Sequence, residues 1–300
     1  MLEIDGSYGE GGGSLVRLAV AFSAVSQKPC KIINIRAKRT NPGLQAQHVA
    51  AVDAVADLCM AETSGLEVGS RQIEFTPSKI KKGNLEIDIG TAGSVALVLQ
   101  ALMIPAVHAE EQVVAKIKGG THTLNAPTTG YLDHVLLPIL AKMGYEAKLT
   151  LYKYGFYPKG GGLVEIAGAD NAGLFRGTAL GINTVYVDSD GDGAAIDIYG
   201  RFKDTMIGAG AVGELKKKAE KVGAEAGKMF MSAFNSNAPV DAHAADQLLP
   251  YMALAAPQGP SRIKVEKVTQ HAKTNIWLIK NFLPVDIKVK GKIIEVKKAK

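Results

Sequence analysis

The sequence has few cysteines and no long uninterrupted apolar run. Its two cysteines, Cys30 and Cys59, are too few for a disulfide framework or a cysteine-based zinc site. The longest apolar stretch, 95–109, contains polar side chains and is shorter than the roughly 20 residues of a membrane-spanning helix. The first residues lack the charged and apolar segments of a secretory signal. We therefore expect a cytoplasmic protein with no membrane partner.

Three common catalytic signatures are also missing. There is no Gly-x-x-x-x-Gly-Lys-Ser/Thr loop, no His-Glu-x-x-His pair and no Gly-x-Ser-x-Gly elbow. Their absence disfavours a P-loop nucleotide site, a zinc hydrolase and an α/β-hydrolase, respectively. Any phosphate or nucleotide chemistry must therefore use another arrangement of residues.

The composition suits a large α/β protein with an anionic partner. With 300 residues and 47% hydrophobic content, the chain can bury a large core and form more than one domain. The net charge of +6 fits a partner such as nucleic acid. Runs rich in β-branched residues alternate with alanine-rich runs, which predicts α/β units. We expect strands at 30–35, 71–75, 85–89 and 112–117, and helices at 15–25, 45–60, 95–106, 131–143, 213–234, 242–255 and 276–282.

Two parts of the sequence resemble each other, and a third part differs from both. The run Glu3-Ile4-Asp5-Gly6 leads through glycines to Ser14-Leu15-Val16, and Glu86-Ile87-Asp88-Ile89-Gly90 leads to Ser94-Val95-Ala96. This repetition suggests a duplicated βα unit, and helix 242–255 suggests a third copy. Residues 177–237 hold an Asp/Gly run followed by a Lys/Glu/Ala-rich helix. We interpret them as an inserted subdomain.

A glycine-rich loop at 6–13 is the first candidate functional segment. It holds five glycines around Glu10 and precedes a predicted helix that contains Arg17. Glycines let the backbone approach a ligand closely, and a helix N-terminus attracts anions. A carboxylate in such a loop would repel phosphate unless a cation lay between them. The pattern suggests a phosphate or nucleotide site with a metal at Glu10, and the alternative is a tight strand–helix connection.

Further candidates follow the second predicted strand and precede the last predicted helix. Arg36 and Arg39 lie between a strand and a Pro-Gly turn, where guanidinium groups suit phosphate oxygens. Gln47 and His48 begin the next helix. The alternatives are a solvated basic loop and a capping or surface role. His271, in a polar segment before an apolar helix, can serve as base, ligand or nucleophile, or simply as a surface residue.

Ordered blocks of the sequence resemble the RNA 3′-terminal phosphate cyclase family. Together they span most of the chain outside 177–237. The main blocks are Asp5-Gly6-x-x-Gly9-Glu10-Gly11-Gly12-Gly13, Arg36-Ala37-x-Arg39-x-x-Pro42-Gly43-Leu44-x-x-Gln47-His48, Ile89-Gly90-x-Ala92-Gly93-Ser94, Gly155-Phe156-Tyr157-Pro158-x-Gly160-Gly161-Gly162 and His271-x-x-Thr274-Asn275-Ile276. The resemblance implies an α/β fold with three repeated βαβαββ units and a smaller inserted α/β subdomain.

The resemblance also implies a reaction of the ligase class. Such enzymes use ATP to convert an RNA 3′-terminal phosphate into a 2′,3′-cyclic phosphodiester. A histidine, matched here by His271, takes AMP from ATP and passes it to the RNA phosphate, and the neighbouring 2′-OH then displaces AMP. The implied partners are RNA 3′-phosphate ends, with ATP as substrate and Mg²⁺ or Mn²⁺ as the metal.

Roles for individual residues follow from the same resemblance. Glu10 matches the metal-binding acid, and Asp246 matches an acid beside the nucleophile. The matched ATP- or RNA-binding residues are Arg17, Arg36, Arg39, Gln47, Gln100, Pro127, His243 and Asp246. The resemblance places His271, Asp246 and Arg39 in the catalytic set, and His243 and Pro127 on the two faces of the adenine.

The implied domain division is a core of 1–176 and 238–300 with an inserted subdomain at 177–237, which looks shorter than is usual in the family. One alternative is a non-catalytic RNA-binding relative of the ribosome-assembly kind, which would lose the histidine. Another is a transferase with the fold of enolpyruvyl-shikimate-phosphate synthase, which lacks the histidine block. The oligomeric state does not follow from the sequence.

Overall fold

The computed structural model describes residues 1–81, 83–110, 112–168 and 184–299, and its class is the predicted mixed α/β. The chain forms two compact units. The first consists of Met1–Leu85, Leu97–Val113 and Ser236–Lys300, and the second of Glu86–Ala96 and Val114–Asn235. The inserted subdomain at 177–237 stays a prediction, and its first residues, 177–183, lie outside the described residues.

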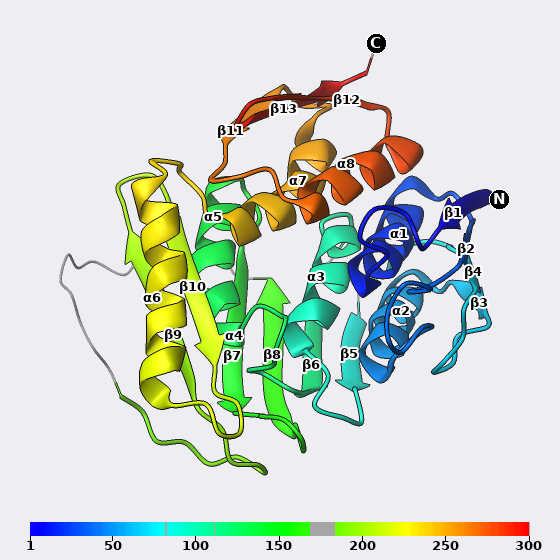
Figure 1. Cartoon of the computed structure of the whole chain (residues 1–300). Coiled ribbons are helices and arrows are strands. Elements are labelled where there is room, and N and C mark those ends of the chain that lie inside the picture. The colour runs from blue at the N-terminus through cyan, green and yellow to red at the C-terminus, as the bar shows by residue number, and fades with distance from the viewer. Residues whose placement is uncertain (82, 111, 169–183, 300) are drawn as a thin grey trace. The chain divides into compact units, whose positions relative to one another are not determined.

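The first unit begins with a four-stranded sheet covered by two helices (Figure 1). Its elements are β1 (Leu2–Asp5), α1 (Gly13–Ser26), β2 (Cys30–Ile33), α2 (Ala46–Cys59), β3 (Glu62–Ser64) and β4 (Ile73–Thr76). The strand order is β1-β2-β4-β3, with β1 and β2 parallel and the other pairs antiparallel. Alternate side chains such as Ile4, Ile32 and Phe75 are fully buried, as expected for a sheet with one face toward a core. Cys30 and Cys59 are buried free thiols.

The same unit ends in a second helix-covered sheet. Its elements are α7 (Ala242–Ala255), β11 (Ser261–Lys264), α8 (Gln270–Phe282), β12 (Val285–Lys290) and β13 (Ile293–Lys298). The strands pair antiparallel in the order β11-β13-β12, and α7 and α8 lie against one face (Figure 1). Helix α1 packs against both α2 and α8, and the ring centroids of Phe22 and Phe282 are 6.2 Å apart. This packing brings the glycine-rich loop before α1 close to the start of α8.

Most of α3 (Val95–Ala106) belongs to the first unit, as do residues 83–85 and 113 at the starts of two strands, and the second unit holds the rest of the remaining sheets. These comprise β5 (Gly83–Asp88), β6 (Val113–Gly119), α4 (Thr129–Tyr131), the π-helical η1 (Leu132–Leu136), α5 (Leu137–Lys142), β7 (Ala147–Lys153), β8 (Gly162–Gly168), β9 (Ala195–Arg201), β10 (Met206–Val212) and α6 (Ala219–Asn235). One sheet has the order β5-β6-β8-β7. The β9–β10 pair is covered by α6, where Val222 and Ala226 pack on Ala211.

The predicted helix 131–143 is found as three consecutive segments, α4, the π-helical η1 and α5, and other predicted helices differ mainly at their first residues. Helices 95–106 and 242–255 are found with the predicted bounds. Helix α6 begins at Ala219 rather than at 213, and Lys216 has a positive φ of 66°, which a helix cannot contain. Helix α8 begins at Gln270 rather than at 276, because Thr269 caps it. Within the described part of the chain, no helix is long and apolar enough to cross a membrane.

A buried polar network in the second unit yields a stability prediction. The Thr128 hydroxyl donates to Asp197 Oδ1 at 2.6 Å and accepts from the Tyr131 N–H at 3.0 Å, capping the helix that follows. His122 Nε2 lies 3.4 Å from the other Asp197 oxygen. We expect Thr128→Val to lower the free energy of unfolding by about 1–3 kcal/mol, because it removes a cap and leaves a carboxylate short of a donor. Urea titration measures this loss. The exposed Thr63→Val is the control, and an unchanged midpoint for Thr128→Val would contradict the prediction.

Candidate active site

The glycine-rich loop connects β1 to α1 through two residues with positive φ. Gly9 and Gly11 have φ values of 59° and 55°, a conformation that other residues rarely adopt. The Asp5 carboxylate accepts the N–H of Ser7 at 2.9 Å and so fixes the start of the turn. This hydrogen bond also lowers the pKa of Asp5. The loop therefore presents Glu10 from a defined backbone.

Two glycines of the loop leave room for side chains that come from other elements. A Cβ on Gly9 would collide with Thr274 Oγ1 of α8, and a Cβ on Gly13 would collide with the imidazole of His48. The Tyr8 ring stacks on Trp277 of α8, with centroids 3.9 Å apart. The glycines thus let α1, α2 and α8 approach the loop closely, a role in addition to the ligand approach that the sequence suggests.

Arg17 is a buried cation with an unpartnered nitrogen. It lies on α1, is 4% exposed, and its Nη2 donates to Gln100 Oε1 of α3 over 3.4 Å. Its Nε has no hydrogen-bond partner within the described structure. Burial lowers the pKa of the guanidinium to about 10, so the group is still charged at neutral pH. A buried charge with an open donor suits an anionic ligand.

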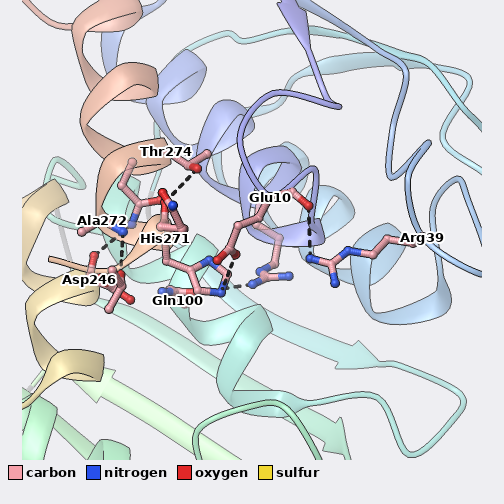
Figure 2. A network of polar contacts seen from close by, with 11 residues as sticks. Glu10, Arg39, Gln100, Asp246, His271, Ala272 and Thr274 are labelled. Atoms are coloured by element: carbon pink, nitrogen blue, oxygen red, sulfur yellow. Dashed lines mark hydrogen bonds and ion pairs between the residues drawn. The ribbon is translucent and has the colours of Figure 1, made fainter. Parts of the chain in front are cut away.

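The segment after β2 carries the two other predicted arginines. Arg36 has a φ of 51° and donates from Nη1 to the carbonyls of Asn41 and Gly43, at 2.5 and 2.8 Å. It therefore holds its own loop closed. The exposed Arg39 donates from Nη2 to the Glu10 carbonyl at 3.3 Å, which ties this loop to the glycine-rich one (Figure 2).

The start of α2 is fixed by a capping box in which His48 takes part. Its Nδ1 accepts the N–H of Gln45 at 2.9 Å, and its ring is buried against Gly13. Burial, with smaller contributions from the charges of Arg17 and Arg36, lowers the pKa of His48 to about 3. His48 is therefore a neutral structural residue, whereas Gln47 beside it is half-buried.

The low pKa of His48 predicts acid-sensitive stability. The unfolded chain has the usual pKa of about 6.5, so it binds an extra proton as the pH falls from 6.5 toward 3. The stability that neutral His48 provides is complete above pH 6.5 and is lost below it, by roughly 2 kcal/mol at pH 5. We expect His48→Gln, which keeps an acceptor for Gln45, to lose correspondingly less stability between pH 7 and pH 5.

Urea titrations of both proteins at the two pH values measure this difference. The raised pKa of Asp246 acts in the opposite direction, but it is present in both proteins and cancels. His134→Gln, at a half-exposed position of the second unit, is the control and should follow the native protein. Parallel losses for native protein and His48→Gln would show that His48 is not buried in its neutral form.

His271 lies in the first turn of α8, two residues after the cap, and not before the helix as predicted. The Thr269 hydroxyl accepts the N–H of Ala272 at 2.9 Å and thereby sets the start of the helix. His271 Nε2 is 2.9 Å from Glu10 Oε2, and this pair is the centre of the network in Figure 2. Burial lowers the pKa of His271, and the Glu10 charge opposes that shift. The imidazole is therefore mainly neutral at pH 7.

Asp246 of α7 contacts Thr269, two residues before His271. Its Oδ1 accepts the Thr269 hydroxyl at 2.6 Å, and its carbonyl accepts Asn275 Nδ2 at 3.0 Å. Burial raises the pKa of Asp246 to about 7, the hydrogen bond from Thr269 lowers it, and the charge of Glu10 raises it further. The carboxyl thus orients the first turn of α8 through Thr269.

Two further residues predicted for the site are His243 and Pro127. His243 is an exposed residue of the first turn of α7, and its charge lowers the pKa of His271. Pro127 is partly buried in the second unit, just before α4. The sequence interpretation missed Thr269, although a threonine directly before a helix is a recognisable N-cap signal. It also missed the stack of Tyr8 on Trp277, for which the sequence offers no signal.

Comparison with known proteins agrees with the sequence blocks. The family model for RNA 3′-terminal phosphate cyclase matches residues 8–289. A protein of that name from Methanosarcina barkeri is 40% identical over an alignment of 329 positions, covering 97% of this chain and 97% of its own. Proteins of the same name from Korarchaeum cryptofilum and Nitrosospira multiformis are 38% and 39% identical, covering 97% and 96% of this chain and 94% and 93% of theirs. The match includes both Glu10 and His271, and the chain belongs to the RNA 3′-terminal phosphate cyclase family.

Proposed function

We propose that this protein uses ATP to convert RNA 3′-terminal phosphates into 2′,3′-cyclic phosphodiesters through a histidinyl-AMP intermediate on His271. The observation that carries the proposal is the contact of His271 with Glu10, at the start of α8 and beside the buried Arg17. Figure 2 shows the Glu10–His271 pair, and the charge of the buried Arg17 is near enough to lower the pKa of His271.

His271 has the protonation state that a nucleophile needs. Its lowered pKa keeps the ring neutral at pH 7, so one ring nitrogen has a free lone pair. A carboxylate only accepts hydrogen bonds, so the 2.9 Å contact places the ring proton on Nε2. Attack through Nε2 therefore requires that Nε2 pass its proton to the Glu10 carboxylate or to water, and that Glu10 then withdraw from this nitrogen.

The phosphate groups of ATP fit the buried Arg17. The unpartnered Nε of this residue is the kind of orphaned donor that a bound phosphate oxygen satisfies. Gln100 accepts a hydrogen bond from the Arg17 guanidinium, and the exposed Arg39 donates to the Glu10 carbonyl, which leaves other donors of its guanidinium for a phosphate. From the family resemblance we also assign Gln47, His243 and Asp246 to the nucleotide site, whereas Pro127, a residue of the second unit, stays a prediction.

A divalent metal fits this site only as part of a metal–nucleotide complex. The described residues contain no cluster of three or more histidine, cysteine or carboxylate ligands. Mg²⁺ is commonly bound by one or two carboxylates together with substrate phosphates and water, which matches the single carboxylate of Glu10. Bound there, Mg²⁺ or Mn²⁺ would neutralise charge on the triphosphate.

The proposed reaction has three steps that each exchange one bond to phosphorus. The His271 nitrogen bonds to the α-phosphorus of ATP and pyrophosphate leaves. An oxygen of the RNA 3′-phosphate then takes the adenylyl group and frees His271. The neighbouring 2′-OH loses its proton and attacks the 3′-phosphorus, and AMP leaves. Asp246 holds the first turn of α8 through Thr269 while the ring changes its charge.

Incubation with α-labelled ATP and Mg²⁺ or Mn²⁺ tests this function. We expect protein-bound AMP that acid releases and alkali spares, as for a phosphoramidate, and conversion of a 3′-phosphorylated RNA to the cyclic form. A protein that binds this RNA but never takes up label or cyclises it would instead be a non-catalytic relative.

We further propose three βαβαββ units with an insertion at 177–237. The order β1-β2-β4-β3 recurs as β5-β6-β8-β7, which supports two such units. The sheet β11-β13-β12, with a parallel bridge between Val240 and Val265, supports a third whose first strand is reduced to that bridge. The pair β9–β10 with α6 would belong to the inserted part.

A further inference from the structure

The outward face of the sheet β11-β13-β12 carries an excess of positive charge. On β13 the side chains of Ile294 and Val296 are fully buried, so the alternate positions of the three paired strands point outward. These positions hold five basic and two acidic side chains, a net charge of +3. They are Arg262, Lys264, Lys288, Lys290 and Lys297, with Asp286 and Glu295.

The other sheet of the same unit has the opposite charge. The outward positions of β1-β2-β4-β3 hold one basic and four acidic side chains, a net charge of −3. They are Lys31, Glu3, Asp5, Glu62 and Glu74. The positive face is therefore specific to the C-terminal sheet and is not a general feature of the exposed sheets of this unit.

The acidic neighbours on the positive face neutralise it only weakly. Asp286 is 4.0 Å from Lys288 Nζ and 3.8 Å from Lys297 Nζ, so one carboxylate is shared between two lysines. Exposed pairs at such distances contribute little. Lys290 is exposed at the end of β12, and Lys264 donates to the Asn237 carbonyl at 3.1 Å. These ammonium groups can therefore bind phosphates of another molecule.

One end of the positive face lies near His271 along the chain. Lys264 and Lys290 are both paired with Ile293 and so share that end of the sheet. Five residues after Lys264 the chain reaches Thr269, the cap of α8, a span of at most about 17 Å. Between them Lys267 is close enough to Asp246 to lower the pKa of that carboxyl. Helix α8 covers the opposite face of this sheet, so an RNA strand whose end is held at His271 would pass around the sheet end at Lys264 and Lys290 to reach these lysines.

We propose that this face binds the phosphate backbone of the RNA substrate upstream of its 3′-phosphate. The inference rests on the proposed cyclase function, which supplies a polyanion with its end at His271. Lysines bind phosphates as point charges and carry no base readout. The face therefore increases affinity for long RNA of any sequence, and the end of the chain alone selects the substrate.

The test compares two triple variants with equal changes in net charge. The first, Lys264→Gln/Lys288→Gln/Lys290→Gln, removes charge from the face. The control, Lys216→Gln/Lys218→Gln/Lys221→Gln, removes it from exposed positions of the second unit. The probe is a labelled single-stranded RNA of about 20 nucleotides with a 3′-phosphate, long enough to cover a site of 4–16 nucleotides. Its binding is measured by fluorescence anisotropy at several salt concentrations.

We expect the first variant to bind this RNA at least about tenfold more weakly at low salt, with the control unchanged. The slope of log K against log salt should fall by about 2, since each lost phosphate contact on a single strand contributes about 0.7. Cyclisation should show a raised KM for the long RNA and an unchanged KM for a dinucleotide 3′-phosphate.

If the native protein and the first variant bind the RNA equally well, or if the control loses as much affinity as the first variant, the proposal that RNA binds this face is wrong. Both outcomes are compatible with AMP labelling and cyclisation by the native protein, so the cyclase function would survive them. Native protein that takes up no label would overturn the function instead, while the anisotropy comparison would still decide whether RNA binds this face.

Discussion

Replacement of His271 by asparagine is expected to abolish covalent transfer of AMP to the protein, with labelling reduced at least about 1,000-fold. Asparagine has no nitrogen lone pair of comparable basicity, so the bond to the α-phosphorus cannot form. Its side chain is still polar and compatible with the first turn of α8, which is capped by Thr269 and not by His271. Cyclisation of RNA should be lost to the same extent.

AMP labelling with α-labelled ATP and thermal unfolding are measured on the same samples. Together they distinguish a loss of reactivity from a loss of folded protein. His108→Asn, at an exposed position after α3, serves as the matched control and should label like the native protein. We expect His271→Asn to unfold at the same temperature as the native protein and to take up no AMP label. Full labelling of His271→Asn would mean that another residue is the nucleophile.

Gly9→Ala is expected to lower adenylylation about 100-fold while leaving the protein folded. Gly9 has a φ of 59°, and its added Cβ would collide with Thr274 Oγ1. The loop must then move away from α8, which separates Glu10 from His271 and disturbs the stacking of Tyr8. A displacement of about 1 Å at reacting groups can reduce rates by such a factor.

A second substitution separates the collision from the backbone strain. Thr274→Ala removes the hydroxyl that the new Cβ would meet, so Gly9→Ala/Thr274→Ala should regain part of the activity. The positive φ still costs about 1 kcal/mol, and rescue should be incomplete. Gly223→Ala, in a helix with open space around it, is the control. If the single and double variants label equally poorly, the contact with α8 does not position the loop.

Much of the fold is predictable from the sequence because its signals are local. Helices α3 and α7 follow from long apolar and alanine-rich runs, and strands β2, β4, β5 and β6 from runs of β-branched residues, whereas the other strands are not predicted. The first residues of α6 and α8 are harder to predict from the sequence. The start of α8 depends on one hydroxyl at 269, and that of α6 on the left-handed backbone of Lys216.

The site is predictable in its charged members but not in their contacts. Glu10, Arg17 and His271 stand out by residue type and by family resemblance. The structure pairs Glu10 with His271 (Figure 2), and the charge of Arg17 lowers the pKa of His271. That Asp246 acts through Thr269, or that Arg36 binds its own loop, depends on side-chain geometry between distant segments. Such geometry leaves no local pattern in the sequence.

Because Arg17 is buried, binding of an anion to it would also affect the stability of the whole protein. Without an anion, a charged group with an unsatisfied donor stays in the core between α1 and α3, at the expense of the folded state. A nucleotide bound to the folded chain alone adds about 2.7 kcal/mol of stability at 100 times its Kd. If the proposed function holds, ATP would stabilise the folded chain, and depletion of ATP would expose this protein to proteolysis as well as deprive it of substrate.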